Sequence, residues 1–99
     1  MKLLLIHLLL LPLLVMAETP NFQAWQYVYA NGSPIQLSLG HAAPCVTDWD
    51  GDGVKDLLVG QYTGGMIRLY LNSGTNSSPV FTTFTYLQAD GVNIQLPYG

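Results

Sequence analysis

Apolar residues in most of this chain occur in runs too short for helices, and turn residues separate these runs. Residues 56–61 contain a continuous apolar run, which is typical of a buried strand, and residues 66–72 carry apolar side chains on both alternating faces. The dipeptides Asn31-Gly32 and Asp90-Gly91 are typical of tight hairpin turns. The pattern predicts an all-β protein with strands at 22–30, 35–39, 43–47, 56–61, 66–72, 80–88 and 92–96, and a polar loop at 73–79.

The first 17 residues have a different pattern. Lys2 precedes an apolar run at 3–15 that contains Pro12, and small residues at Val15 and Ala17 form a cleavage pattern. The run is short for a membrane span, which needs about 20 apolar residues. We therefore expect residues 1–17 to be a signal peptide and the mature chain to be secreted, without a membrane span. The alternative is an uncleaved anchor.

Charge is sparse outside one loop. After residue 17, six acidic residues face only two basic ones, Lys55 and Arg68, and four of the six acids lie between positions 48 and 56. Nucleic-acid binding needs clustered basic side chains that contact phosphates, so nucleic acid is excluded as a partner. The many aromatic and β-branched residues also argue against a disordered chain.

The acidic residues of this loop are spaced as in a calcium site. They stand at relative positions 1, 3, 5 and 9, with a backbone carbonyl available at position 7 and Gly53 permitting a sharp turn at position 6. Without a cation the gathered carboxylates would repel one another. The predicted ligands of a bound Ca²⁺ are Asp48, Asp50, Asp52, the Val54 carbonyl and Asp56. An EF-hand is excluded because position 12 is Val59 and no helix flanks the loop.

Residues 48–60 match the pattern D-x-D/N-x-D-G-x-x-D-L-x-V-G throughout. Gly64-Gly65 follows as a predicted hairpin turn, and residues 66–74 follow as a third strand. In these features the chain resembles the FG-GAP/VCBS-type repeats that form blades of β-propellers, as in integrin α subunits. The resemblance implies an antiparallel β-propeller blade with a structural calcium ion, whose partners are the neighbouring blades of the same propeller.

The chain also contains an internal repeat. Residues 20–40 align without a gap with residues 79–99 at an offset of 59, which is of blade size but somewhat longer than the roughly 40 to 50 residues of common propeller repeats. The identical pairs are Pro20/Pro79, Phe22/Phe81, Tyr27/Tyr86, Ala30/Ala89, Gly32/Gly91, Ile35/Ile94, Gln36/Gln95, Leu37/Leu96 and Gly40/Gly99. We expect a first repeat at 18–78 and the truncated start of a second at 79–99.

Three further features have alternative interpretations. The alternating Trp25, Tyr27 and Tyr29 could stack on a sugar or pack against a neighbouring blade. Cys45 could be a free thiol or pair with a part of the protein outside this sequence. His41 lacks a second histidine nearby in the sequence and is a weak metal candidate.

Three functional classes fit these observations. The first is a secreted calcium-binding propeller segment of a larger extracellular or cell-surface protein, serving adhesion or binding of a carbohydrate or protein ligand. The second is the non-catalytic propeller portion of an extracellular polysaccharide-active enzyme, and the third is a purely structural spacer. We do not expect catalysis by this chain, because the Gly-x-Ser-x-Gly pattern is absent and the clustered acids are assigned to the metal.

Overall fold

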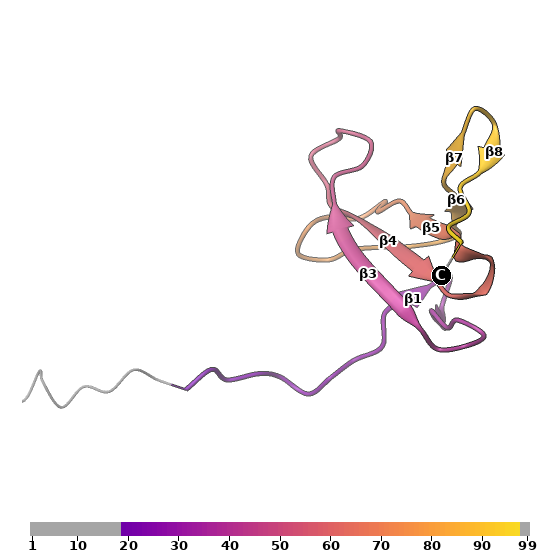
Figure 1. The fold of residues 1–99 in the computed structure, drawn as a ribbon. Helices are drawn as coiled ribbons and strands as arrows, with labels where there is room; N and C mark the ends of the chain where they lie inside the picture. The colour runs from indigo at the N-terminus through magenta and orange to yellow at the C-terminus, as the bar shows by residue number, and fades with distance from the viewer. Residues whose placement is uncertain (1–18, 98–99) are drawn as a thin grey trace, which may run out of the picture.

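The computed structural model describes residues 19–97, and its regular structure is antiparallel β-sheet (Figure 1). Its strands are β1 (Tyr29–Ala30), β2 (Ser33–Pro34), β3 (Ala42–Thr47), β4 (Asp56–Gln61), β5 (Ile67–Tyr70), β6 (Thr85–Tyr86), β7 (Gln88–Ala89) and β8 (Val92–Asn93). The only helical element in this part of the chain is the 3₁₀ turn η2 (Thr63–Gly65). The all-β prediction is therefore confirmed, whereas the predicted signal peptide at 1–17 lies outside the described residues.

A four-stranded antiparallel sheet in the order β3-β4-β5-β6 forms the centre of the molecule. Two rows of its register are Val46–Leu57–Tyr70 and Cys45–Leu58–Leu69–Thr85. Because successive side chains of a strand point to opposite faces, these rows lie on opposite faces of the sheet. We call the face of Leu57 and Tyr70 face A and that of Leu58 and Leu69 face B.

The hydrophobic core lies on face A. Leu57, Val59 and Tyr70 are buried there, and the partly buried residues packed against them are Ala30, Ile35, Leu37, Phe81 and Phe84. Leu58 and Leu69 are buried on the other face, as the alternation in residues 66–72 predicts. Apolar side chains are thus buried on both faces of a single sheet.

The two strands on either side of the acidic loop were predicted well, and the others only in part. Strands at 43–47 and 56–61 are present, and Gly64 and Gly65 form the turn before β5 with positive φ of 72° and 57°. The prediction of a strand at 35–39 is wrong, because Ile35 and Leu37 use their side chains to cover face A and that segment joins no β-ladder. The strands predicted at 22–30 and 92–96 are each reduced to a two-residue strand, and the one predicted at 80–88 is interrupted, with β6 and the first residue of β7 inside it.

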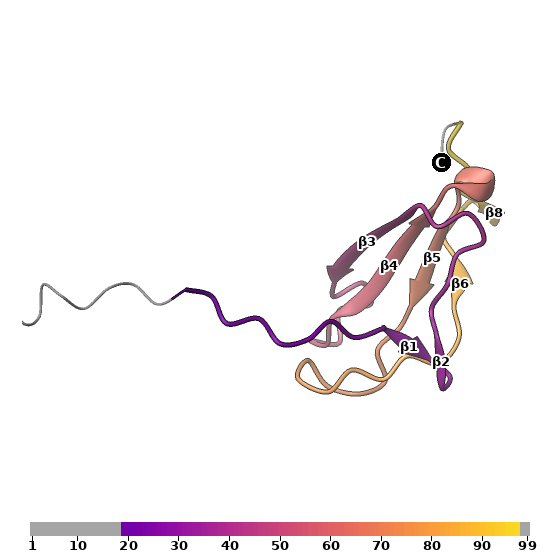
Figure 2. The ribbon, with the colours of Figure 1, turned by 90° about the horizontal axis from the view of Figure 1, so that it is seen from below.

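Two hairpins of the same geometry flank the sheet, well apart in both views (Figures 1 and 2). In β1–β2 the pairs are Tyr29–Pro34 and Ala30–Ser33, and in β7–β8 the pairs 59 positions later adopt the same register. Their turns also agree, with φ of 50° and 76° at Asn31-Gly32 and 51° and 77° at Asp90-Gly91. Positive φ at both central residues is the geometry that such dipeptides favour.

Candidate metal centre

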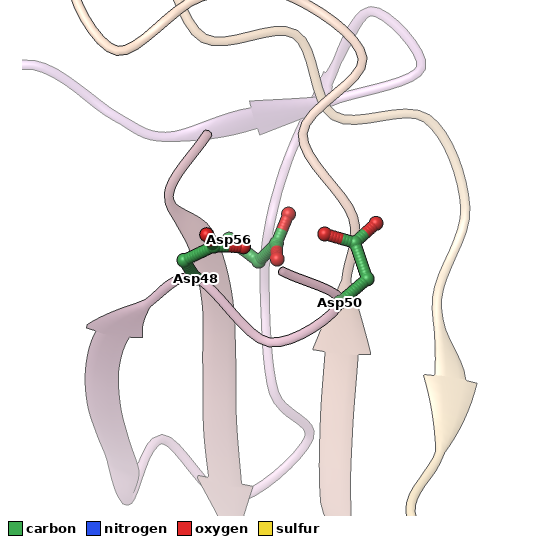
Figure 3. A group of neighbouring side chains, drawn as sticks. All are labelled: Asp48, Asp50 and Asp56. Carbon is green, nitrogen blue, oxygen red and sulfur yellow. The ribbon is translucent and has the colours of Figure 1, made fainter. Parts of the chain in front are cut away.

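The acidic loop connects β3 to β4 at one end of the sheet. Thr47 and Asp56 are the last paired residues of these strands, so residues 48–55 must close the chain over this end. Figure 3 shows the side chains of Asp48, Asp50 and Asp56 gathered there. One carboxylate oxygen from each of the three lies within 4.8 Å of the others. The structure therefore brings together three of the predicted ligands.

Asp48 is fixed by the loop that it begins. Its Oδ1 accepts a hydrogen bond from Gly51 N and its Oδ2 accepts one from Gly53 N, each at 2.9 Å. Both glycines have positive φ, 77° and 85°, a region that residues with a Cβ rarely adopt. The turn predicted at Gly53 is thus confirmed, and it curls the loop around the Asp48 carboxylate.

Asp56 is held from the protein interior. Its side chain is fully buried, Oδ2 accepts a hydrogen bond from Trp49 N at 2.9 Å, and Oδ1 accepts one from Asn72 N at 2.8 Å. A buried carboxylate needs such donors, because burial without them would strongly disfavour its charge. Each oxygen keeps further lone-pair capacity, which leaves Asp56 able to bind a cation.

Asp50 completes the group from the exposed side of the loop. Its Oδ1 accepts a hydrogen bond from Asp52 N at 3.3 Å. Desolvation within the loop and the nearby carboxylates of Asp52 and Asp56 raise the pKa of Asp50 above its usual value. A cation in the loop would offset this accumulation of negative charge.

Two predicted ligands lie outside the group of three. The Asp52 carboxylate accepts a hydrogen bond from Val54 N at 2.9 Å, which is a local turn contact. Val54 is partly buried. Ligation by Asp52 and by the Val54 carbonyl stays a prediction.

Two asparagines that the sequence analysis did not single out support the loop. Asn76 Oδ1 accepts a hydrogen bond from Lys55 N at 2.8 Å, and Asn76 Nδ2 donates to Gly53 O at 3.2 Å. Buried Asn72 donates from Nδ2 to Lys55 O at 3.0 Å, while its backbone N–H contacts Asp56. Both come from the segment that follows β5, so the loop is fixed by contacts 16 to 23 positions away. The only sequence signal for them is the polar composition of residues 72–78.

This geometry suits one hard cation. Oxygen ligands stand 2.3–2.6 Å from Ca²⁺, so two donors on the same ion are at most about 5 Å apart. The oxygens of the three carboxylates satisfy this limit. Backbone N–H groups hold the carboxylates of Asp48 and Asp56 in place. The cluster can therefore hold a metal ion through its oxygens.

The other candidate residues lie apart from the acidic group. His41 packs beside Tyr62, with ring centroids 5.5 Å apart, and Cys45 is an exposed free thiol on β3. Trp25 and Tyr27 contact each other edge to face at 5.1 Å and are exposed. An open groove of about 520 Å³ lies against face B, and its lining includes Ala43, Cys45, Leu58, Ile67, Met66 and Leu96.

Comparisons with known proteins gave no match: no protein-family model matches the chain, and neither curated proteins nor solved structures contain a significant counterpart. Across residues 19–97 no helix is long and apolar enough to cross a membrane.

Proposed function

We propose that this chain is a secreted, calcium-stabilised β-propeller segment of the FG-GAP/VCBS type, which serves adhesion or ligand binding within a larger extracellular protein. The observation that carries the proposal is the convergence of Asp48, Asp50 and Asp56 at the end of an antiparallel sheet. This convergence accompanies a sequence pattern that specifies the ligand spacing, the turn glycine and the outgoing strand together.

Calcium is favoured over magnesium by the number and arrangement of oxygen donors. With Asp52 and the Val54 carbonyl the loop offers five protein ligands, and water can complete the six to eight that calcium accepts. Magnesium requires near-ideal octahedral geometry and keeps several of its own waters. A glycine-bearing loop with two positive-φ residues suits the more tolerant ion.

The ion is proposed to be structural. Asp56 belongs to β4, Asp48 follows β3, and both are already hydrogen-bonded to the loop or to the segment after β5. A cation held by both side chains would connect these segments and neutralise their charge. At an affinity of about 10⁻⁴ M, millimolar calcium would stabilise the fold by roughly 1.4 kcal/mol.

The proposed role as a blade is supported by the two-sided sheet. Face A is covered by Ile35, Leu37 and the aromatic residues near β6, whereas an apolar groove remains open against face B. Propeller repeats bury such faces against their neighbours. A neighbouring blade is accordingly the proposed partner of this groove.

Calcium titration tests the proposal directly. Calorimetry on the chain should show calcium uptake, with much weaker magnesium uptake, and Asp50→Asn should abolish it. Asp90→Asn is the matched control, because Asp90 lies in the β7–β8 turn outside the acidic group and its positive φ of 51° suits asparagine equally well. Absence of calcium uptake by the folded parent, or equal uptake by the Asp50 variant, would refute the metal assignment.

The proposed ligand binding needs its own test. The exposed Trp25 and Tyr27 are the candidate sugar-stacking residues, since aromatic faces pack well against apolar sugar surfaces. A glycan array probed in the presence of calcium separates a binding module from a structural spacer. Binding that disappears in Trp25→Ala would support a carbohydrate ligand.

A further inference from the structure

The segment before β1 exposes an unusual set of aromatic residues. Residues 19–28 run away from the sheet as an extended chain in both views (Figures 1 and 2). Phe22, Trp25 and Tyr27 are 87 %, 77 % and 56 % exposed. An extended segment that exposes apolar side chains can pair with another chain.

The internal repeat identifies what this segment fits. Its counterparts 59 positions later are Phe81, Phe84 and Tyr86, and all three are partly buried along β5. Phe81 and Phe84 contact the Tyr70 ring at centroid distances of 6.4 and 5.5 Å. The edge of β5 is therefore a binding site for an aromatic strand of this sequence.

The pairing geometry of that site is defined. Tyr86 stands opposite Arg68 and Thr85 opposite Leu69, while Phe81 bridges to Asn72 further along. The guanidinium of Arg68 lies 4.4 Å from the centre of the Phe84 ring. Trp25 occupies the position equivalent to Phe84, and an indole is the best partner for such a cation.

The second halves of the two repeat copies occupy different places. In the first repeat segment, residues 20–40, Ile35 N donates to Val28 O at 2.8 Å, and Ile35 and Leu37 pack on face A. In the second repeat segment, Ile94 N donates to Leu87 O at 2.9 Å, but Leu96 lies at the groove on face B, where its N donates to Gly65 O at 3.0 Å. The first repeat segment thus covers one face of the sheet, and the second reaches the opposite face.

From this arrangement we propose that residues 20–28 of one copy pair with β5 of a second copy of this chain, in place of that copy's residues 79–87. Within residues 20–37 of the incoming copy, the first part completes the sheet of the acceptor copy. The second part covers face A of the incoming copy's own sheet, and that sheet covers the groove on face B of the acceptor.

The exchange is favoured by what it buries. One extended segment replaces another with aromatic residues at the same positions, so the pairing itself is nearly balanced. Burial of Phe22 and Trp25 is offset by exposure of the displaced Phe81 and Phe84, so the net gain is the cover over the groove of about 520 Å³. Because donor and acceptor surfaces differ, the contact is heterologous and builds rings or open chains of copies. The proposal does not depend on calcium binding.

Sedimentation of the full chain over a range of concentrations is the first test. The parent should form oligomers, and Phe22→Asp/Trp25→Asp should remain monomeric. Val92→Asp is the control, because Val92 is a comparably exposed apolar residue on β8 outside the donor segment, and this variant should assemble like the parent. A parent that stays monomeric, or a Phe22/Trp25 variant that still assembles, overturns the proposal.

Cross-linking tests the register. Two full-length variants, Tyr27→Cys and Arg68→Cys, are mixed in a Cys45→Ser background and oxidised. The register of Arg68 with Tyr86 predicts a disulfide-linked heterodimer. A Gln23→Cys donor, whose counterpart Thr82 lies four residues from Tyr86, should give at least tenfold less product. Equal yields from the two donors would overturn the proposed pairing.

Discussion

Replacing Asp56 by asparagine separates the structural contribution of this carboxylate from its proposed metal binding. The side chain is fully buried, and its two oxygens accept hydrogen bonds from Trp49 N at 2.9 Å and Asn72 N at 2.8 Å. Asparagine has the same shape but only one oxygen. One of the two backbone N–H groups must therefore face an amide NH₂ group.

The expected loss has two parts. A buried donor left without an acceptor costs about 1–3 kcal/mol, and this loss is present without any ion. The parent should gain roughly a further 1.4 kcal/mol at millimolar calcium, assuming an affinity of about 10⁻⁴ M. The variant should gain almost none of this, because its buried ligand has lost its charge.

Urea unfolding followed by tryptophan fluorescence measures both parts. The free energy of unfolding of the parent, Asp56→Asn and the control Asp90→Asn is compared in a calcium chelator and then in calcium. We expect Asp56→Asn to be less stable in the chelator and unresponsive to calcium, and Asp90→Asn to match the parent in both conditions.

Two results would refute this reasoning. Equal stability of Asp56→Asn and the parent in the chelator would mean that the two backbone hydrogen bonds do not matter energetically. An unchanged response of the variant to calcium would mean that Asp56 is not a ligand.

Four further predictions concern the loop, the core and the N-terminus. The pKa of Asp50 is raised in the folded loop, so protonation of Asp50 stabilises the calcium-free fold. This stabilisation is lost as pH rises through the folded pKa. Urea titrations in chelator should therefore show that the free energy of unfolding depends less on pH in Asp50→Asn than in the parent. Asn76→Ala should weaken calcium binding in calorimetry by roughly tenfold, a change of about 1.4 kcal/mol, because the loop loses two hydrogen bonds; unchanged affinity would show that this support is dispensable. Leu57→Ala should destabilise the fold by about 2–5 kcal/mol, whereas the exposed Leu39→Ala should change little, as urea unfolding can check. Mass spectrometry of the secreted protein should find Glu18 at its N-terminus, and a secreted form that keeps residues 1–17 would contradict the signal-peptide prediction.

Local sequence was sufficient for the features that depend on a few adjacent residues. The hairpin turns at Asn31-Gly32 and Asp90-Gly91 follow from residues that tolerate positive φ, and both have the predicted geometry. The spacing of Asp48, Asp50 and Asp56 already implied a loop that directs carboxylates toward one point. β4 was predictable because a continuous apolar run between turn residues needs a buried, extended environment, whereas the six residues of β3 are all exposed.

Tertiary structure decided which extended segments pair. Residues 20–28 and 79–87 share the same aromatic pattern, yet only the second lies along β5, because a ladder requires a neighbour that the local sequence does not specify. The same holds for Asn72 and Asn76, whose support of the acidic loop depends on how the segment after β5 folds back over it. Side-chain pattern determined where the chain is extended and where it turns, and contacts between distant segments determined which backbone groups found partners.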